Sequence, residues 1–420
     1  MPATPEILII ADDLSGAADC AIACLAAGID SFVALDGDRA VPPSGALAID
    51  TDSRRLPGEA AAATTARVLR RHAGPQTRLI YKKMDSTVRG NFAAEIAACL
   101  AVARTELSAP EAVAIFAPAY PRNGRTTRGG HQYLRDVPLE ETETWRHDGI
   151  SGRAHLPEIM ARTGLKVGLV ELAVLHGPDL AATLRDMSRS HDVLVFDAAV
   201  EEDLQAIAEA GQQLGPMTVW AGSAGLARYL PQAAGLARPA AAQVPGKTQA
   251  GPVICAVGSL SQVSRGQFER LCAADGVSGF VVPPELLRHG PDAEDWHQLN
   301  AAIAGAIAAG QDIAVMIGDS DHLDTSEALK LAAVLAALLH PYLAQARGII
   351  ATGGETARAL LRTLEVTALQ LVTEVEPGVP LSVVGTGPAA GLRVITKAGA
   401  FGTAETLLHC RNHLKSSLTS

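Results

Sequence analysis

Short runs of branched apolar residues alternate with longer stretches of helical periodicity along most of the chain. The first run, residues 7–10, leads through a polar turn into a small-residue helix expected over residues 17–27. The same pattern predicts strands at residues 31–35, 46–50, 78–82, 112–117, 166–169, 192–197, 218–221, 252–257, 279–282, 312–317 and 348–352. It predicts helices at residues 59–72, 91–104, 265–273, 298–309, 327–339 and 356–364. This alternation is typical of an α/β fold with mostly parallel sheets.

A segment rich in Ala, Pro and Gly, residues 234–252, interrupts the alternation and has no sustained period of its own. Such a composition favours an interdomain linker. The length of 420 residues is enough for two or three domains. We therefore expect two α/β domains, residues 1–235 and 253–420, joined by a linker over 236–252.

Composition and charge exclude several classes of protein. A chain that is 48% hydrophobic and 19% charged does not favour disorder, and its apolar runs fall short of the ~18–20 residues that span a bilayer. No secretory signal is evident, so a cytoplasmic protein without membrane contact is expected. A net charge of −10 argues against nucleic-acid binding, although a local cationic cluster can still hold a small anion. The six cysteines and twelve histidines show no zinc-site spacing.

Polar residues at strand ends are the first candidates for chemistry, because ligands of open α/β sheets bind beyond the carboxyl ends of the strands. Asp12 and Asp13 follow the first strand. Asp13 is suited to capping the next helix, near its positive N-terminus. Asp12 is harder to explain as a cap. It is a candidate acceptor of substrate hydroxyl protons, or a general base.

Two later turns are strongly cationic. Residues 81–91 read YKKMDSTVRGN and stand between a strand and a helix. They form either a solvated charged loop or an oxyanion pocket, in which Lys supplies a point charge and Arg a planar fork. Residues 118–130 contain three arginines, two prolines and three glycines, and form either a shaped cationic loop or a structural turn.

Glycine-rich turns follow strands in the second half of the chain, at residues 257–261, 352–356 and 397–402. Glycine lets the backbone approach a phosphate, and a helix N-terminus binds it. Three such turns in one domain indicate a nucleotide site. The chain has neither a GxxxxGK[ST] nor a GxGxxG motif, so neither a P-loop fold nor a dinucleotide site is predicted.

In order and spacing, these segments resemble the four-carbon acid sugar kinase family, whose members phosphorylate D-threonate, D-erythronate or 3-oxo-tetronate. The resemblance covers nearly the whole chain. It is carried by IADDLSGAADCA, KKMDSTVRGN, PAYPRNGRTTRGG, VGSLSQVSRGQ, ATGGETARALL, EVEPGVPLS and TKAGAFG. It implies an N-terminal domain for the sugar acid, a C-terminal domain for ATP, and an active-site cleft between them.

The resemblance also implies roles for individual residues. The implied sugar-acid contacts are Asp12, Arg54, Lys82, Lys83, Met84 and Asp85. Of these, Asp12 and Asp85 are the candidate catalytic carboxylates. The implied ATP contacts are Ser259, Gly353, Gly354, Glu355, Thr356, Gly399 and Gly402. The family often has Asp where this chain has Glu355. Mg²⁺ is expected with ATP, although its ligands are not assigned, and a homodimer is left open.

The implied activity is an ATP-dependent phosphotransferase of carbohydrate metabolism acting on the terminal hydroxyl, O4, of D-threonate. The Lys-Lys-Met-Asp-Ser-Thr segment is more similar to the D-threonate and D-erythronate branch, and D-erythronate and 3-oxo-tetronate remain alternative substrates. A non-catalytic sugar-acid binding protein is the alternative of another class, but it would not need three glycine-rich turns. In the kinase, hinge closure about the linker would exclude water from the reaction.

Overall fold

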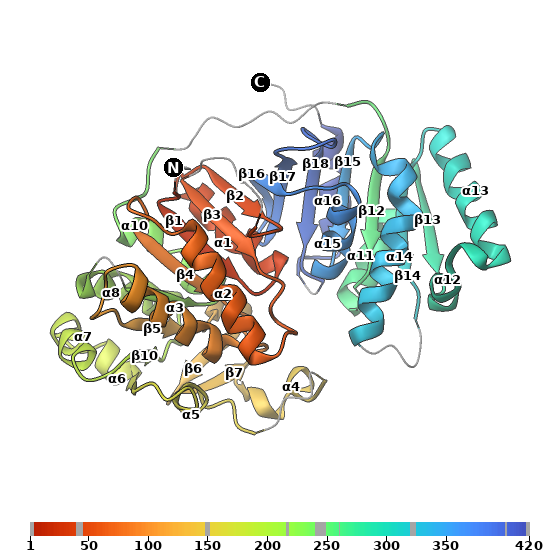
Figure 1. The fold of residues 1–420 in the computed structure, drawn as a ribbon. Coiled ribbons are helices and arrows are strands. Elements are labelled where there is room, and N and C mark those ends of the chain that lie inside the picture. The colour runs from red at the N-terminus through yellow and green to blue at the C-terminus, as the bar shows by residue number, and fades with distance from the viewer. Residues whose placement is uncertain are drawn as a thin grey trace. The chain divides into compact units, whose positions relative to one another are not determined.

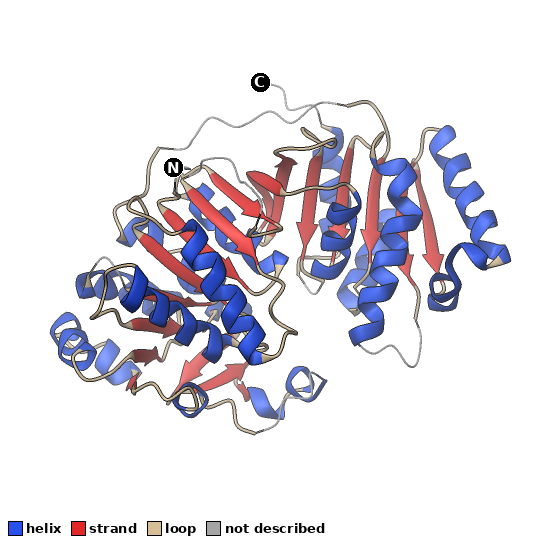
Figure 2. Ribbon diagram, viewed as in Figure 1, coloured by secondary structure: helices blue, strands red, loops and turns tan. Residues whose placement is uncertain are grey.

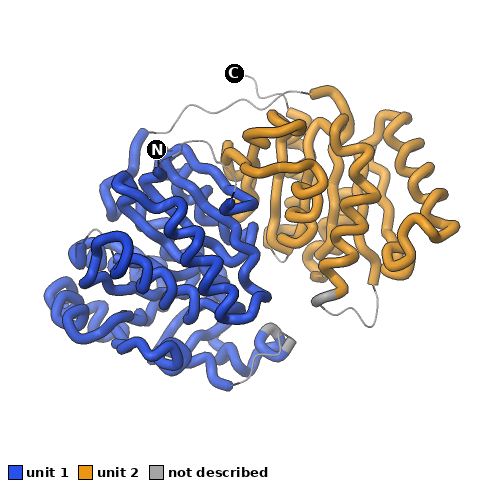
Figure 3. Tube along the Cα trace, viewed as in Figure 1, with its two compact units in different colours: residues 1–241 blue, residues 242–420 orange. Residues whose placement is uncertain are grey.

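The computed structural model describes residues 4–38, 45–147, 152–215, 218–239, 249–259, 261–319, 325–399 and 401–416. The chain divides into two compact units, residues 1–241 and 242–420 (Figure 3). Both units are α/β, and most strand pairs are parallel, as the sequence predicts. The linker over 236–252 stays a prediction, because residues 240–248 lie outside the described residues.

The sheet of the first unit has the strand order β2-β3-β1-β4-β11-β5-β10-β9, and each neighbouring pair is parallel. Its strands are β1 Ile7–Ala11, β2 Ser31–Ala34, β3 Ala46–Asp50, β4 Leu79–Lys83, β5 Ala114–Ala117, β9 Val167–Val170, β10 Val193–Phe196 and β11 Val219–Gly222. Except for β9, each of these strands is buried along its whole length. Burial on both faces explains why they read as continuous apolar runs.

Helices cover both faces of this sheet (Figures 1 and 2). Helices α2 and α3 pack against each other and against one face of the sheet. Helix α1 packs against the opposite face and against α9. The helices are α1 Leu14–Ala26, α2 Gly58–His72, α3 Phe92–Glu106, α4 Glu143–His147, α5 Leu156–Ala161, α6 Leu172–Leu175, α7 Leu180–Ser188, α8 Glu201–Gly211, α9 Ala224–Ala227 and α10 Leu230–Ala233. The expected loop at 118–130 contributes to a small antiparallel sheet of β6 Arg125–Arg128, β7 His131–Leu134 and β8 Val137–Pro138.

The strand order of the first unit reverses at β1. This strand pairs with β3 on one side and with β4 on the other. The chain passes from β1 to β2 on one side and from β4 to β5 on the other side, so the switch point lies between β1 and β4. Residues that follow β1 and β4 therefore border the crevice where ligands of such sheets bind. Asp12 and the cationic segment after β4 lie at this point.

The second unit has the strand order β13-β14-β12-β15-β18-β17-β16. Its strands are β12 Val253–Val257, β13 Val277–Val282, β14 Asp312–Ile317, β15 Gly348–Thr352, β16 Ala368–Glu376, β17 Val379–Val384 and β18 Arg393–Lys397. Pairing is parallel from β13 to β18 and antiparallel through β17 and β16. Strands β16 and β17 were not expected, and β18 was expected only as the strand ahead of the turn at residues 397–402. The order reverses between β12 and β15, which places the residues after these strands at a second switch point.

Helices of the second unit also form two layers. Helices α11 and α16 share one apolar cluster, and α14 packs against α15. The helices are α11 Gln262–Cys272, α12 Pro284–His289, α13 Glu294–Ala308, α14 Thr325–Leu343, α15 Gly354–Thr363 and α16 Thr406–Lys415. Across the described ranges of both units, no helix combines the length and apolarity that membrane crossing requires.

Candidate functional site

Arg54 joins two carboxylates at the switch point of the first unit. Its Nε lies 2.7 Å from Asp12 Oδ2 and its Nη2 lies 3.1 Å from Asp12 Oδ1. Asp12 directly follows β1 and is only 1% exposed. Asp13 accepts a hydrogen bond from the Gly16 N–H at 2.9 Å and thereby caps α1, as predicted. Its Oδ1 also lies 2.9 Å from Arg54 Nη2, so one guanidinium binds both Asp12 and Asp13.

The loop that carries Arg54 is fixed from several sides. The Thr51 hydroxyl donates a hydrogen bond to the last carbonyl of β1 at 2.7 Å. The Asn91 amide donates to the Ser53 carbonyl at 3.2 Å. A Cβ built on Gly90 would lie 3.2 Å from Arg54 Cγ, so this second loop packs closely on the arginine stem. The guanidinium is therefore held in place before any ligand arrives.

Lys82 and Lys83 point to opposite faces of the sheet, because side chains alternate along β4. Lys82 is fully buried, and its Nζ lies 3.2 Å from Glu95 Oε2 of α3. Glu95 also accepts a hydrogen bond from Ser53 Oγ, next to Arg54 in the chain. This geometry gives Lys82 a supporting position beneath the Arg54 loop, and its direct contact with a substrate stays a prediction.

Lys83 lies on the α1 face of the sheet. A Cβ on Gly16 would overlap its ammonium, so the glycine makes room for this cation. Burial lowers the pKa of Lys83, but the carboxylates of Asp13 and Asp12 outweigh burial, and its pKa is raised. Lys83 therefore stays charged beside the acids that Arg54 binds.

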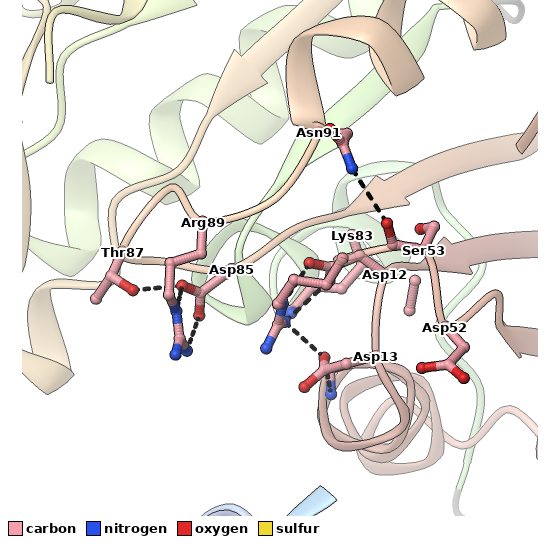
Figure 4. A network of polar contacts seen from close by, with 12 residues as sticks. Asp12, Asp13, Asp52, Ser53, Lys83, Asp85, Thr87, Arg89 and Asn91 are labelled. Atoms are coloured by element: carbon pink, nitrogen blue, oxygen red, sulfur yellow. Dashed lines mark hydrogen bonds and ion pairs between the residues drawn. The ribbon is translucent and has the colours of Figure 1, made fainter. Parts of the chain in front are cut away.

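Asp85 lies two residues after the end of β4, and side chains of the same loop bind its carboxylate. Its two carboxylate oxygens accept hydrogen bonds from Arg89 Nε at 2.6 Å and Arg89 Nη2 at 3.1 Å, and the Thr87 hydroxyl also donates to it (Figure 4). Met84 is fully buried, and its N–H donates to the Gly222 carbonyl of β11 at 2.9 Å. Met84 anchors the turn that presents Asp85, and its own contact with a ligand stays a prediction.

The carboxylates of Asp12 and Asp85 are both held in the ionised form. Burial would raise the pKa of Asp12, but the charges of Arg54, Lys83 and Lys82 outweigh burial and lower that pKa. For Asp85, Arg89 and Arg54 outweigh burial, and the pKa falls well below its usual range. Such carboxylates accept hydrogen bonds from hydroxyl groups but are weak proton acceptors.

Three members of this network were not predicted as site residues: Ser53, Arg89 and Glu95. Arg89 stands in the cationic segment that the sequence analysis singled out, so its charge could have identified it. Glu95 is the only charged residue between Phe92 and Ala103. A lone acid in an otherwise apolar helix is the signal for a buried ion pair.

In the second unit, three glycine turns converge on Ser259 at the carboxyl ends of β12, β15 and β18. A Cβ on Gly399 would overlap the Ser259 hydroxyl, and one on Gly353 would lie 3.6 Å from the Ser259 nitrogen. A Cβ on Gly258 would overlap the Thr356 hydroxyl. Glycine is therefore what allows these three turns to approach one another. Their contact with a nucleotide stays a prediction.

The N-terminus of α15 lies in this group of turns. Gly353 has φ 97°, in the region that favours glycine, and Gly354 is the first residue of the helix. Glu355 lies in the first turn, and Thr356 is buried. The first N–H groups of a helix have no intrahelical partner and carry a partial positive charge. A phosphate is the ligand that fits this arrangement best.

The turn after β18 is anchored by side chains of α11 and its cap. The Ser261 and Ser264 hydroxyls both donate to the Gly399 carbonyl, at 3.0 and 2.6 Å. The Gln267 amide donates to the Phe401 carbonyl at 3.0 Å. Further along, Gly402 has φ 87°, and a Cβ there would overlap the Thr406 hydroxyl at the start of α16.

Within the described ranges, no three or more His, Cys, Asp or Glu side chains are grouped so that they could hold a metal ion. A magnesium ion that accompanies ATP takes its ligands mainly from phosphate and water, with one or two carboxylates. Glu355 supplies a carboxylate in the first turn of α15, beside the proposed phosphate position.

Comparison with known proteins identifies a sugar-binding domain in the first unit and a nucleotide-binding domain in the second. Residues 7–230 match the family model of a sugar-binding N-terminal domain, and residues 254–407 match that of a nucleotide-binding C-terminal domain. The chain is 43% identical to a D-threonate kinase of Cupriavidus necator over 96% of both chains. It is 34% identical to a D-threonate kinase of Bordetella bronchiseptica over 98% of both. A crystal structure from Salmonella typhimurium LT2 has the same fold, with a TM-score of 0.79, 21% identity, and coverage of 99% of this chain and 100% of that one.

Proposed function

This chain belongs to the four-carbon acid sugar kinase family, and we propose that it transfers the γ-phosphate of ATP to O4 of D-threonate. The similarity to D-threonate kinases over nearly the full length of both chains supports the substrate class. D-Erythronate and 3-oxo-tetronate are the alternative acceptors.

The first unit offers a tetronate both charge and hydrogen-bond acceptors. Arg54 and Lys83 are the cations that we assign to the substrate carboxylate, since Arg54 is 21% exposed and can offer N–H groups to a ligand. Asp12 and Asp85 are the acceptors that we assign to substrate hydroxyls. Lys82 then acts indirectly, through Glu95 and the Arg54 loop.

The carboxylates orient the acceptor hydroxyl more than they activate it. Phosphoryl transfer passes through a loose transition state and depends mainly on positioning and charge stabilisation. A weakly basic carboxylate is adequate for this, because the O4 proton leaves late. Asp12 and Asp85 are both candidates to receive it.

The second unit receives the nucleotide. The N–H groups at the start of α15 and the turns around Ser259 suit the phosphates of ATP, with Gly353, Gly354, Thr356, Gly399 and Gly402 as backbone contacts. Mg²⁺, held by the phosphates with Glu355 as a carboxylate ligand, would neutralise charge on the transferred group. Because the hydroxyl and the γ-phosphate must meet, an active-site cleft between the two units is part of the proposal.

The observation that carries the proposal is the convergence of Gly258, Gly353 and Gly399 around Ser259 and Thr356. A protein that only binds sugar acids would not need a set of glycine turns suited to binding phosphates. The convergence therefore favours a kinase over a non-catalytic binding protein.

A coupled assay of ADP release tests the proposal, with ATP, Mg²⁺ and a panel of D-threonate, D-erythronate and 3-oxo-tetronates. We expect the highest kcat/KM with D-threonate, and a phosphate monoester at C4 by ³¹P NMR. Binding of D-threonate without ADP release would instead support the binding-protein alternative. Faster turnover of another tetronate would correct the substrate.

A further inference from the structure

Lys397, the last residue of β18, is a buried lysine that is not among the proposed contacts with the sugar acid or with ATP. It is 2% exposed, and its Nζ donates to the carbonyls of Ala398 at 2.9 Å, Gly399 at 3.0 Å and Phe401 at 3.0 Å. An ammonium has three N–H donors, which matches three carbonyl acceptors. A neutral amine has two donors and a lone pair, which would face one of the carbonyls.

Lys397 also connects two of the glycine turns. Its backbone carbonyl accepts a hydrogen bond from the Gly353 N–H at 2.8 Å, while its ammonium holds the Gly399 carbonyl. Since a Cβ on Gly399 would overlap the Ser259 hydroxyl, small movements of this turn reach Ser259 directly. The residue is thus placed to set the spacing of the turns.

We propose that Lys397 is a positioning residue for the nucleotide: its charged ammonium holds the Gly399 and Phe401 carbonyls, and its backbone carbonyl holds the Gly353 N–H, in the arrangement that receives ATP. This rests on the proposed function of the second unit as the ATP site. Lys397 acts through backbone carbonyls and has no assigned contact with ATP.

The groups that face Lys397 belong to β12, β16 and α16, and are Cys255, Glu376 and Cys410. Burial raises the pKa of both thiols, that of Cys410 to about 12, so they face Lys397 as neutral groups. Glu376 is already bound by the Thr406 hydroxyl and by His409 Nδ1, each at 2.5 Å. Burial outweighs these neighbours and lowers the pKa of Lys397 to about 8. Its proton is therefore lost within a range that binding experiments reach.

Two properties should then move in opposite directions above pH 8. Nucleotide affinity falls, because the neutral amine leaves one carbonyl of the loop without its donor. The contribution of Lys397 to stability rises instead, because its pKa in the folded state is below the ordinary value of 10.5. Between these values the unfolded chain binds more protons, so the contribution of Lys397 to stability rises with pH. A residue that served stability alone would not weaken nucleotide binding in this interval.

Calorimetric titration of the full chain with ADP, from pH 7 to 9.5, tests the proposal. If the charged form alone is competent, the fraction of competent protein at pH 9.5 is about one thirtieth, and affinity falls by about 30-fold. At pH 8, titrations in buffers of different ionisation enthalpy should show uptake of about half a proton per ADP bound.

Three variants complete the experiment. Lys397→Met should bind ADP at least tenfold more weakly at pH 7, with no proton uptake at pH 8. Lys397→Arg keeps the charge and should recover part of the affinity with a flat pH profile. Lys330→Met, on the exposed surface of α14, is the matched control and should follow the wild type.

A wild-type affinity that stays within twofold from pH 7 to 9.5 would overturn the proposal, as would a folded Lys397→Met protein with unchanged ADP affinity. If Lys397→Met fails to fold, the proton uptake of the wild type decides the question. A wild type that binds no ADP at any pH would contradict the ATP site itself, which separates the failure of the proposed function from the failure of this inference.

Discussion

Arg54 donates to both carboxylate oxygens of Asp12, with Nε 2.7 Å from Oδ2 and Nη2 3.1 Å from Oδ1. This ion pair connects the residue after β1 to the loop after β3, so the ends of these two neighbouring strands are held together. The two side chains differ in exposure, 1% for Asp12 and 21% for Arg54. The arginine is therefore the member of the pair that an incoming substrate carboxylate can approach.

We expect Arg54→Ala to raise KM for D-threonate by about 10- to 150-fold, because a charge-assisted hydrogen bond contributes about 1.5–3 kcal/mol. KM for ATP should change less than twofold. Arg54→Lys should recover little, since lysine lacks the planar fork that binds a carboxylate at two points. Steady-state kinetics check all three expectations.

The control for this series is Arg67→Ala, on the exposed surface of α2, where the arginine pairs with Asp38. It should leave both KM values unchanged. An equal rise in KM for ATP and for D-threonate in Arg54→Ala would contradict the assignment of Arg54 to the sugar acid.

Lys82→Met and Glu95→Gln should each destabilise the first unit by about 3–5 kcal/mol, because each leaves a buried partner without its counter-charge. The double variant Lys82→Met/Glu95→Leu should recover much of this loss, since apolar residues of similar volume replace a buried ion pair well. Urea unfolding measures the free energies. A stable double variant with an unchanged KM for D-threonate would contradict both a direct contact of Lys82 with the substrate and its supporting role beneath the Arg54 loop.

The sequence pattern predicts where most strands end, because polar residues usually follow the apolar runs, although Lys82 and Lys83 both belong to β4. It does not predict which of two adjacent lysines faces α1. Lys82 and Lys83 alternate along β4, and the packing of Glu95 and Gly16 on the two faces decides their environments. These contacts join segments that are far apart in the sequence.

The hairpin of β16 and β17 shows a second limit. Pro377 and Gly378 mark a turn, but Gln370, Thr373 and Glu374 break the apolar run of β16, so the preceding residues do not read as a buried strand. Strands in antiparallel sheets tolerate such residues on one face. By contrast, the central parallel strand β12 is apolar throughout and was predicted within one residue.

Asp85→Asn should remove a pH-dependent part of the stability. The pKa of Asp85 is lowered in the folded state by Arg89, Arg54 and the Thr87 hydrogen bond, which outweigh burial. Its ion pair therefore contributes stability that is fully present above the ordinary pKa of 3.8 and is lost as pH falls toward the lowered value. The difference in unfolding free energy between wild type and variant should be largest near pH 6 and should shrink below pH 4.

Urea unfolding at pH 6, 4 and 3 provides the measurement. Asp186→Asn is the control, because its pair with Arg189 is exposed on both sides and contributes little at any pH. A difference for Asp85→Asn that is the same at pH 6 and pH 3 would mean that the carboxylate charge is not what the loop depends on.

The last prediction concerns Gly399, whose missing side chain leaves room for the Ser259 hydroxyl. In Gly399→Ala the new methyl group would overlap that hydroxyl, so either Ser259 or the turn must move. If the turns around Ser259 hold the phosphates, the variant should lose at least tenfold in affinity for ADP and keep its affinity for D-threonate, which calorimetry measures separately. Gly305→Ala, in α13, is the matched control: no atom lies within 4 Å of its added Cβ, and the helix should gain about 0.5–1 kcal/mol of stability. A folded Gly399→Ala protein that binds ADP like the wild type would remove this turn from the nucleotide site. The N-terminus of α15 would then have to hold the phosphates without it.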